Sequence, residues 1–156
     1  MSNRLNINAR TAGSDYVMDF EGRMDEHSIL PQPPVCPIIR INLKNLTLIN
    51  SSGVRLWCEW LKTQKNQPSI ILENCPMVFT KQFNTVRGFL TDNVRVVSFY
   101  VPFIDDKTQQ RHDVLYRFGH EFDDKGNIQH PQVKGTSGNL LEMDVFSETY
   151  FRFLKK

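Results

Sequence analysis

Apolar and polar residues alternate in two stretches near the amino terminus. The stretches "RLNINAR" (4–10) and "YVMDFEG" (16–22) are separated by the turn residues "TAGSD". Alternation with a period of two around a short turn predicts a β-hairpin. The next segment, "GRMDEHSILPQPPVCP" (22–37), contains four prolines. Proline removes a backbone N–H donor and restricts the residue before it, so this segment is predicted to be a loop.

From residue 37 to residue 103 the pattern changes between strand-like and helix-like periods. "PIIRINLKNLTLI" (37–49), "PSIILENC" (68–75) and "DNVRVVSFYVPF" (92–103) are rich in β-branched and apolar residues, which favours strands. "VRLWCEWLKTQ" (54–64) and "PMVFTKQFNTVRGFL" (76–90) have helical spacing. The first helix is expected to bury the stripe formed by Val54, Trp57, Cys58 and Leu61. Strands alternating with helices predict an α/β fold, with helices packed on a partly parallel mixed sheet.

The chain after Phe103 is polar and has only one short apolar run, "VLYRF", before its end. We therefore expect two parts, a domain at 1–103 and a small β-rich appendage at 104–156. The appendage closes with "SETYFRFLKK", where Ser147 is predicted to cap a short helix. The aromatic residues of that helix are too apolar to remain in solvent, so the end is expected to dock.

Composition narrows the functional classes. The 156 residues carry a net charge of +2 and no dense cluster of Lys and Arg, which does not favour nucleic-acid binding. The start "MSNRLNINARTAG" lacks the apolar segment of a signal peptide, and no apolar run reaches the roughly 20 residues of a membrane span. These features predict a cytoplasmic protein without a membrane span.

Two motifs, "EGRMDEHSILP" and "LTLINSSGVRLW", resemble those of the STAS domain, named for sulfate transporters and anti-sigma factor antagonists. In that family a glycine-acidic stretch after an early strand precedes a central strand, which ends in an Asp-Ser-Ser/Thr-Gly loop before a helix. Gly22 and Asp25 match the first feature, and 50–53 match the second. The resemblance covers about residues 16–102 and implies a STAS-like sheet.

More narrowly, the chain resembles a bacterial STAS-like group with a C-terminal zinc-ribbon-like extension. The segments that carry this resemblance are "INSSGVRLW", "ILENCP", "VVSFYVPF" and "YFRFL". That group is expected to carry two C-x-x-C pairs. Here Phe103 is followed by "IDDK", and Lys134 and Ser137 stand where the second pair would fall. We therefore predict that the appendage is a degenerate ribbon that binds no metal and is held together by aromatic packing. The aromatic residues expected to replace the metal are Tyr116, Phe118, Phe122, Phe146 and those of "YFRF".

Ser52 is the candidate phosphoacceptor, because the resemblance assigns that role to the serine before the glycine; Ser51 is the weaker candidate. A helix amino terminus offers unpaired N–H groups and a favourable dipole to a phosphate. The competing interpretation is that Ser51 or Ser52 only caps the helix. Asn50 also departs from the family, since it replaces the acidic residue that usually precedes the pair.

No catalytic motif, phosphate loop or cofactor motif occurs in the chain, which predicts a non-enzymatic protein. The histidines and the three separated cysteines have no metal-ligand spacing, so no metal is expected. Cys75 is interpreted as a buried thiol, with a reactive thiol at a helix start as the alternative.

By resemblance, the function is signalling or scaffolding through a protein partner, such as an anti-sigma factor or a serine-kinase-like regulator. The alternative is a small ligand, a nucleotide or a lipid, bound at the strand-to-helix loops. Leu56 and Trp60 form a second apolar pair that either binds the partner or packs in the core, and packing is favoured for Trp60. The predicted partner surface comprises Asn50, Ser51, Ser52, Gly53, Arg55, Leu56 and Trp60.

Overall fold

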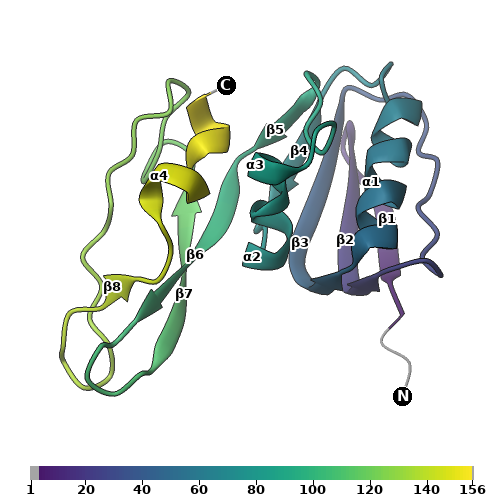
Figure 1. Cartoon of the computed structure of the whole chain (residues 1–156). Coiled ribbons are helices and arrows are strands. Elements are labelled where there is room, and N and C mark those ends of the chain that lie inside the picture. Colours follow the sequence, from purple (N-terminus) through teal and green to yellow (C-terminus); the bar gives the residue numbers. More distant parts are fainter. Residues whose placement is uncertain (1–3, 156) are drawn as a thin grey trace.

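Two β-sheets lie side by side in the computed structural model, which describes residues 4–155 (Figure 1). The first sheet has the order β1-β2-β3-β4-β5; β1 is antiparallel to β2, and the remaining neighbours are parallel. The second is antiparallel, with the order β7-β6-β8. The predicted α/β class with a mixed sheet is confirmed. The strands are β1 Asn6–Ala12, β2 Asp15–Met24, β3 Ile38–Ile49, β4 Ile70–Glu73, β5 Val94–Val96, β6 Ser98–Ile104, β7 Arg111–Arg117 and β8 Glu142–Met143.

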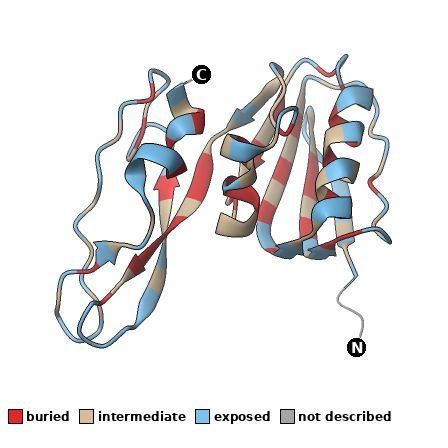
Figure 2. Ribbon diagram, in the orientation of Figure 1, coloured by how far each residue is buried: buried red, intermediate tan, exposed pale blue. Residues whose placement is uncertain are grey.

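The first sheet buries one face under helices and leaves the other open (Figures 1 and 2). Ile39, Ile41 and Leu43 of β3 are fully buried, because alternate residues of a strand point to the same face. On the other face Arg40 pairs with Asp15 and with Glu73. Charged pairs on one face and aliphatic residues on the other produce a two-layer arrangement.

Helix α1, Ser51–Thr63, packs on β2 and β3. Its buried residues are Gly53, Trp57, Trp60 and Leu61. The predicted stripe is therefore rotated, since Val54 and Cys58 are only half-buried. The Trp57 indole N–H donates to the Phe89 carbonyl across 2.9 Å, which joins α1 to the segment before β5.

The single helix predicted for 76–90 is wrong. The chain there forms two one-turn helices, α2 (Met77–Thr80) and α3 (Gln82–Thr85), and Val86 is already extended. Phe79, Phe83 and Phe89 are nevertheless buried as a cluster. Gly88, with φ at +85°, turns the chain after α3 and lets the aromatic ring of Phe89 reach the same core.

The strand predicted for 92–103 is divided at Val97. The Val97 N–H donates to Leu72 of β4, while its carbonyl accepts from Phe118 beside the second sheet. Val97 is therefore the junction between the sheets. The ladder of β6 belongs to the second sheet, but Cys75, just after β4, also bonds to it: its N–H donates to the Ser98 carbonyl and its carbonyl accepts from the Tyr100 N–H. The expected division after Phe103 cuts through the end of β6.

The carboxyl end folds back as helix α4 (Ser147–Tyr150) and the 3₁₀ helix η1 (Arg152–Lys155), as expected for a docking segment. Phe146, not Ser147, occupies the N-cap position of α4, and no side chain caps that helix. Phe146 is also 81% exposed, so its predicted packing role is wrong. Tyr116 and Phe122 are buried, but Phe118 lies at the surface beneath Arg95. Within residues 4–155, no helix is long and apolar enough to span a membrane.

Candidate functional site

The start of α1 is capped by Asn50, not by either serine. The Asn50 side-chain Oδ1 accepts a hydrogen bond from the Gly53 N–H at 2.8 Å, and its backbone is extended. This geometry satisfies one of the N–H groups that a helix leaves unpaired at its first turn. The predicted capping role of Ser51 or Ser52 is therefore wrong, and both hydroxyls are exposed.

The Asn50 amide also joins the helix start to the segment after β2. Its Nδ2 donates to Glu26 Oε2 at 3.0 Å, and this hydrogen bond lowers the pKa of the Glu26 carboxyl group. A carboxylate therefore lies beside the helix N-terminus, supplied by Glu26 rather than by the residue before Ser51. Glu26 is not among the predicted site residues, because no local pattern links it to Asn50, 24 positions further along the chain.

Asp25, predicted from the glycine-acidic motif, shapes this segment from within. The buried carboxylate accepts from the His27 N–H at 3.0 Å and from Arg23 Nε at 3.1 Å. These bonds, with the His27 contact the largest, lower the pKa of Asp25. Asp25 thereby fixes the turn that brings Glu26 to Asn50.

Gly53 is required by close packing. A Cβ atom at this position would lie 2.2 Å from the Met24 carbonyl oxygen at the end of β2. The helix start and β2 can approach this closely only where the helix carries no side chain. Gly53 is consequently buried and offers no side chain to a partner.

A shallow groove of about 290 Å³ lies between α1 and the proline-rich loop. Leu56 lines it, together with Ile29, whose side chain is 85% exposed. Trp60 forms part of the wall but is only 4% exposed; its indole stacks on Trp57 and donates to the Pro31 carbonyl at 2.7 Å. The packing interpretation is therefore correct for Trp60, and we remove this residue from the candidate partner surface. Ile29 belongs to that surface although no sequence pattern indicated it.

Of the two segments expected to carry zinc ligands in the ribbon, the structure joins "IDDK" to the second through Ser137, and the side chains that meet there do not fit zinc. Asp105, only 1% exposed, accepts from Ser137 Oγ at 2.7 Å and from Asn139 Nδ2 at 3.5 Å. The same carboxylate accepts from the backbone N–H groups of Lys107 and Thr108. These contacts, with Ser137 the largest, lower the pKa of Asp105 to about 2. A hydroxyl, an amide and one carboxylate lack the thiolate and imidazole donors that structural zinc prefers. Within residues 4–155, no group of three potential metal ligands occurs.

Cys75 is fully buried at the start of α2, and burial raises the pKa of its thiol far above the ordinary value. Burial likewise raises the pKa of Cys58. A reactive thiolate needs exposure and positive surroundings, so the reactive-thiol alternative for Cys75 is wrong.

The candidate site thus consists of the α1 N-terminus with its exposed serines, Glu26 beside it, and the groove formed by Leu56 and Ile29. Comparisons with protein-family models, with curated proteins and with solved structures found no match for this chain.

Proposed function

We infer that this protein is a non-enzymatic signalling or scaffold module, resembling anti-sigma factor antagonists, that binds a protein partner through α1 and the adjoining loop. The β3-to-α1 connection through 50–53 and the parallel packing of β3 between β2 and β4 support the resemblance. The partner would be a protein with an apolar knob that fills the groove beside Leu56.

The observation that carries this proposal is the alignment of Ser52 with the groove. Ser52 and Leu56 are four residues apart on α1 and therefore lie on the same face of the helix. Leu56 lines the groove, and Ile29 stands exposed across from it. A group added to Ser52 would lie one turn from the surface that a partner contacts.

Phosphorylation at Ser52 would then act on binding and leave the fold intact. A phosphate adds about two negative charges at neutral pH. The helix N-terminus stabilises such charge by about 0.3 to 1 kcal/mol, so α1 should remain folded. The partner would instead meet a dianion beside the Glu26 carboxylate, which opposes the docking of an apolar or acidic surface.

We test this proposal with a photo-crosslinking amino acid at Ile29, in the wild type and in Ser52→Asp. We expect a specific protein partner from the source cell to crosslink to the wild type and to be recovered several-fold less with Ser52→Asp. Ser51→Asp is the matched control, because position 51 faces Arg55, away from Leu56. A crosslinker at Asn66, beyond the end of α1, should capture nothing specific.

Two outcomes contradict the proposal. Equal recovery of every specific partner by the wild type and Ser52→Asp removes the switch. If the crosslinker captures a specific partner at Asn66 but none at Ile29, the partner binds outside the groove and the proposed surface is wrong.

A further inference from the structure

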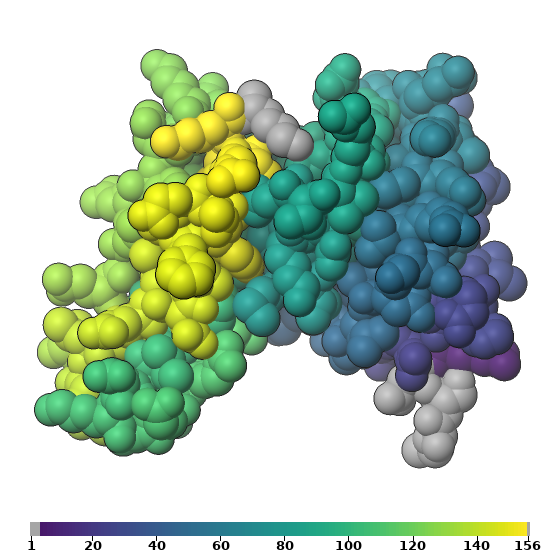
Figure 3. Space-filling model, in the orientation of Figure 1, coloured from purple at the N-terminus to yellow at the C-terminus, as the bar shows by residue number. Residues whose placement is uncertain are grey.

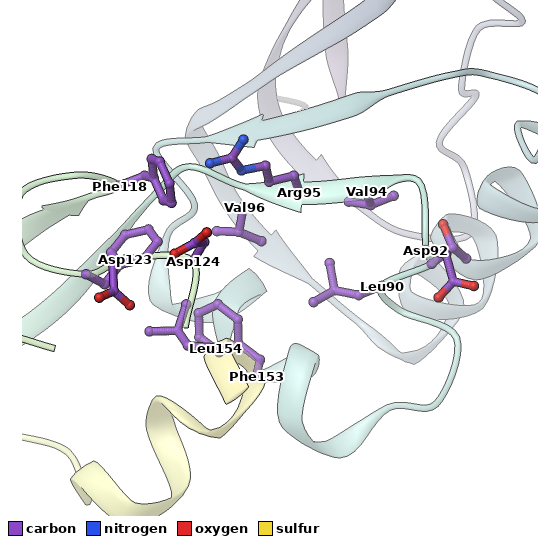
Figure 4. Close-up of a pocket in the computed structure, with 12 residues that line it drawn as sticks. Leu90, Asp92, Val94, Arg95, Val96, Phe118, Asp123, Asp124, Phe153 and Leu154 are labelled. Carbon is purple, nitrogen blue, oxygen red and sulfur yellow. The ribbon is translucent and has the colours of Figure 1, made fainter. Parts of the chain in front are cut away.

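A second hollow lies between the free edge of the first sheet and the C-terminal appendage (Figure 4). It has a volume of about 370 Å³, and its walls come from β5, from the loop after β7 and from η1. Figure 4 shows Leu90, Val96 and Phe153 pointing into it from different segments. Apolar side chains from three segments therefore line the hollow, and it shares no lining residue with the groove on α1.

Strand β5 ends the first sheet and offers unpaired backbone groups at this hollow. The Ile70 N–H donates to Asn93, and the Val97 N–H donates to Leu72. In a parallel ladder the intervening peptide groups of Val94 and Val96 must then point away from β4. The Val94 N–H is bonded to Thr91. Among the described residues, no loop or turn hydrogen bond reaches the Val94 carbonyl or either backbone group of Val96, and the ladder geometry turns these groups away from β4.

Charge around the hollow is predominantly negative. Asp92 lies at one end, and Asp123 and Asp124 lie at the other (Figure 4). Arg95 is the one cation among the lining residues, and its guanidinium sits 4.0 Å from the centre of the Phe118 ring. Three carboxylates against one guanidinium oppose a phosphate-bearing ligand, such as a nucleotide, and favour a cationic one.

We propose that this hollow binds an extended peptide segment of a partner protein, which adds to the sheet as a strand beside β5. The peptide backbone would pair with the free groups of Val94 and Val96, since strand addition uses an exposed sheet edge in this way. An apolar side chain of the peptide would enter between Leu90 and Phe153. Lys or Arg residues flanking it would face Asp92 at one end and the Asp123–Asp124 pair at the other.

The occupant is a peptide because of the spacing of the unpaired groups along the strand. A small cationic molecule could fill the apolar centre, but it would leave the Val96 N–H and carbonyl unpaired in a confined site. An extended backbone satisfies them and places alternate side chains toward the hollow. This site is independent of the α1 surface and of any phosphorylation at Ser52.

The test uses the immobilised full chain and a phage-displayed library of random short peptides. We expect enrichment of peptides with an apolar residue flanked by Lys or Arg. An enriched peptide should lose at least about tenfold in affinity for Leu90→Glu, a typical cost of disrupting a central contact. Leu56→Glu, in the α1 groove, is the matched control and should bind like the wild type. Thermal melting confirms that both variants fold.

Backbone pairing is tested separately with the enriched peptide. Methylation of the peptide nitrogens that face β5 should abolish binding, and NMR should show the Val96 amide among the most shifted signals. Three results overturn the proposal: enriched peptides that still bind after N-methylation, enriched peptides that are acidic, or equal affinity of an enriched peptide for the wild type and for Leu90→Glu. A library without any enrichment over the Leu90→Glu variant overturns it as well. Concentration-dependent dimerisation through Val96 would assign the edge to a second copy and also contradict it.

Discussion

At the scale of single residues, the motif 50–53 divides its tasks among its members. Asn50 caps the helix and binds Glu26, Gly53 permits the contact with Met24, and the two serines are left exposed. The turn chemistry was predictable, because Asn, Ser and Gly favour a strand-to-helix connection. Which residue caps was not, since all three polar residues are competent N-caps.

Gly53→Ala tests the close approach of α1 to β2. Alanine favours a helix by about 1 kcal/mol over glycine, so propensity alone predicts stabilisation. The new Cβ would lie 2.2 Å from the Met24 carbonyl oxygen, however, and backbone atoms cannot yield cheaply. We expect the clash to win and to lower the free energy of unfolding by about 2 kcal/mol, measured by urea denaturation. Ser52→Ala should change it by less than about 0.5 kcal/mol. Equal stabilities of the two variants would disprove the close approach.

At the scale of elements, the local pattern placed long elements better than short ones. β3 and α1 lie close to where their periodicity placed them, because each carries a long and consistent pattern. The segment 76–90 has helical spacing, yet its phenylalanines reach the core from two single turns and a loop. Spacing shows which residues are buried, but burial alone does not require one continuous helix.

The appendage shows the same limit with polar residues. The sequence predicts aromatic packing in place of zinc ligands, and Tyr116 and Phe122 are buried as this requires. The carboxylate of Asp105 additionally joins the two turns that the missing ligands would have joined. Its partner Ser137 lies far along the chain, so no local pattern indicates the bond.

Asp105→Asn provides a pH test of this connection. The pKa of Asp105 in the fold, about 2, is below the ordinary value of 3.8, so the folded state favours the ionised form. Its contribution is therefore fully present above about pH 4 and is lost as the pH falls through about 2. We expect Asp105→Asn to have a lower urea midpoint at neutral pH, and the gap to the wild type should close between about pH 4 and pH 2.

The matched control for this test is Asp106→Asn, whose carboxylate is exposed beside Asp105. Its urea midpoint should follow that of the wild type at each pH. If the difference in urea midpoint between Asp105→Asn and the wild type stays constant down to pH 2, the ionised carboxylate is not its cause. A chelator should not change the urea midpoint of any of the three proteins.

At the scale of the whole molecule, the two sheets share one hydrophobic core. Figure 3 shows the C-terminal segment, in yellow, packed against the teal segment of the first sheet's helices. Phe153 of η1 lies 5.0 Å from Phe83 of α3 and 5.1 Å from Phe99 of β6, measured between ring centres. The Asn84 side chain also donates to the Tyr150 carbonyl at 3.0 Å. The appendage is therefore coupled to the sheet and should not unfold independently.

Phe153→Ala tests that coupling. Removing a buried phenylalanine side chain costs about 3 kcal/mol or more, because the cavity collapses only in part. Since Phe153 contacts both parts, we expect Phe153→Ala to lower the urea midpoint of a single cooperative unfolding transition. Tryptophan fluorescence and far-ultraviolet circular dichroism should give the same midpoint. Trp57 and Trp60 lie on α1, so their fluorescence reports on the side of the core that covers the first sheet. Phe146→Ala, which removes an exposed ring, should change stability by less than about 0.5 kcal/mol. A tryptophan transition that Phe153→Ala leaves unmoved would show instead that the sheets fold separately.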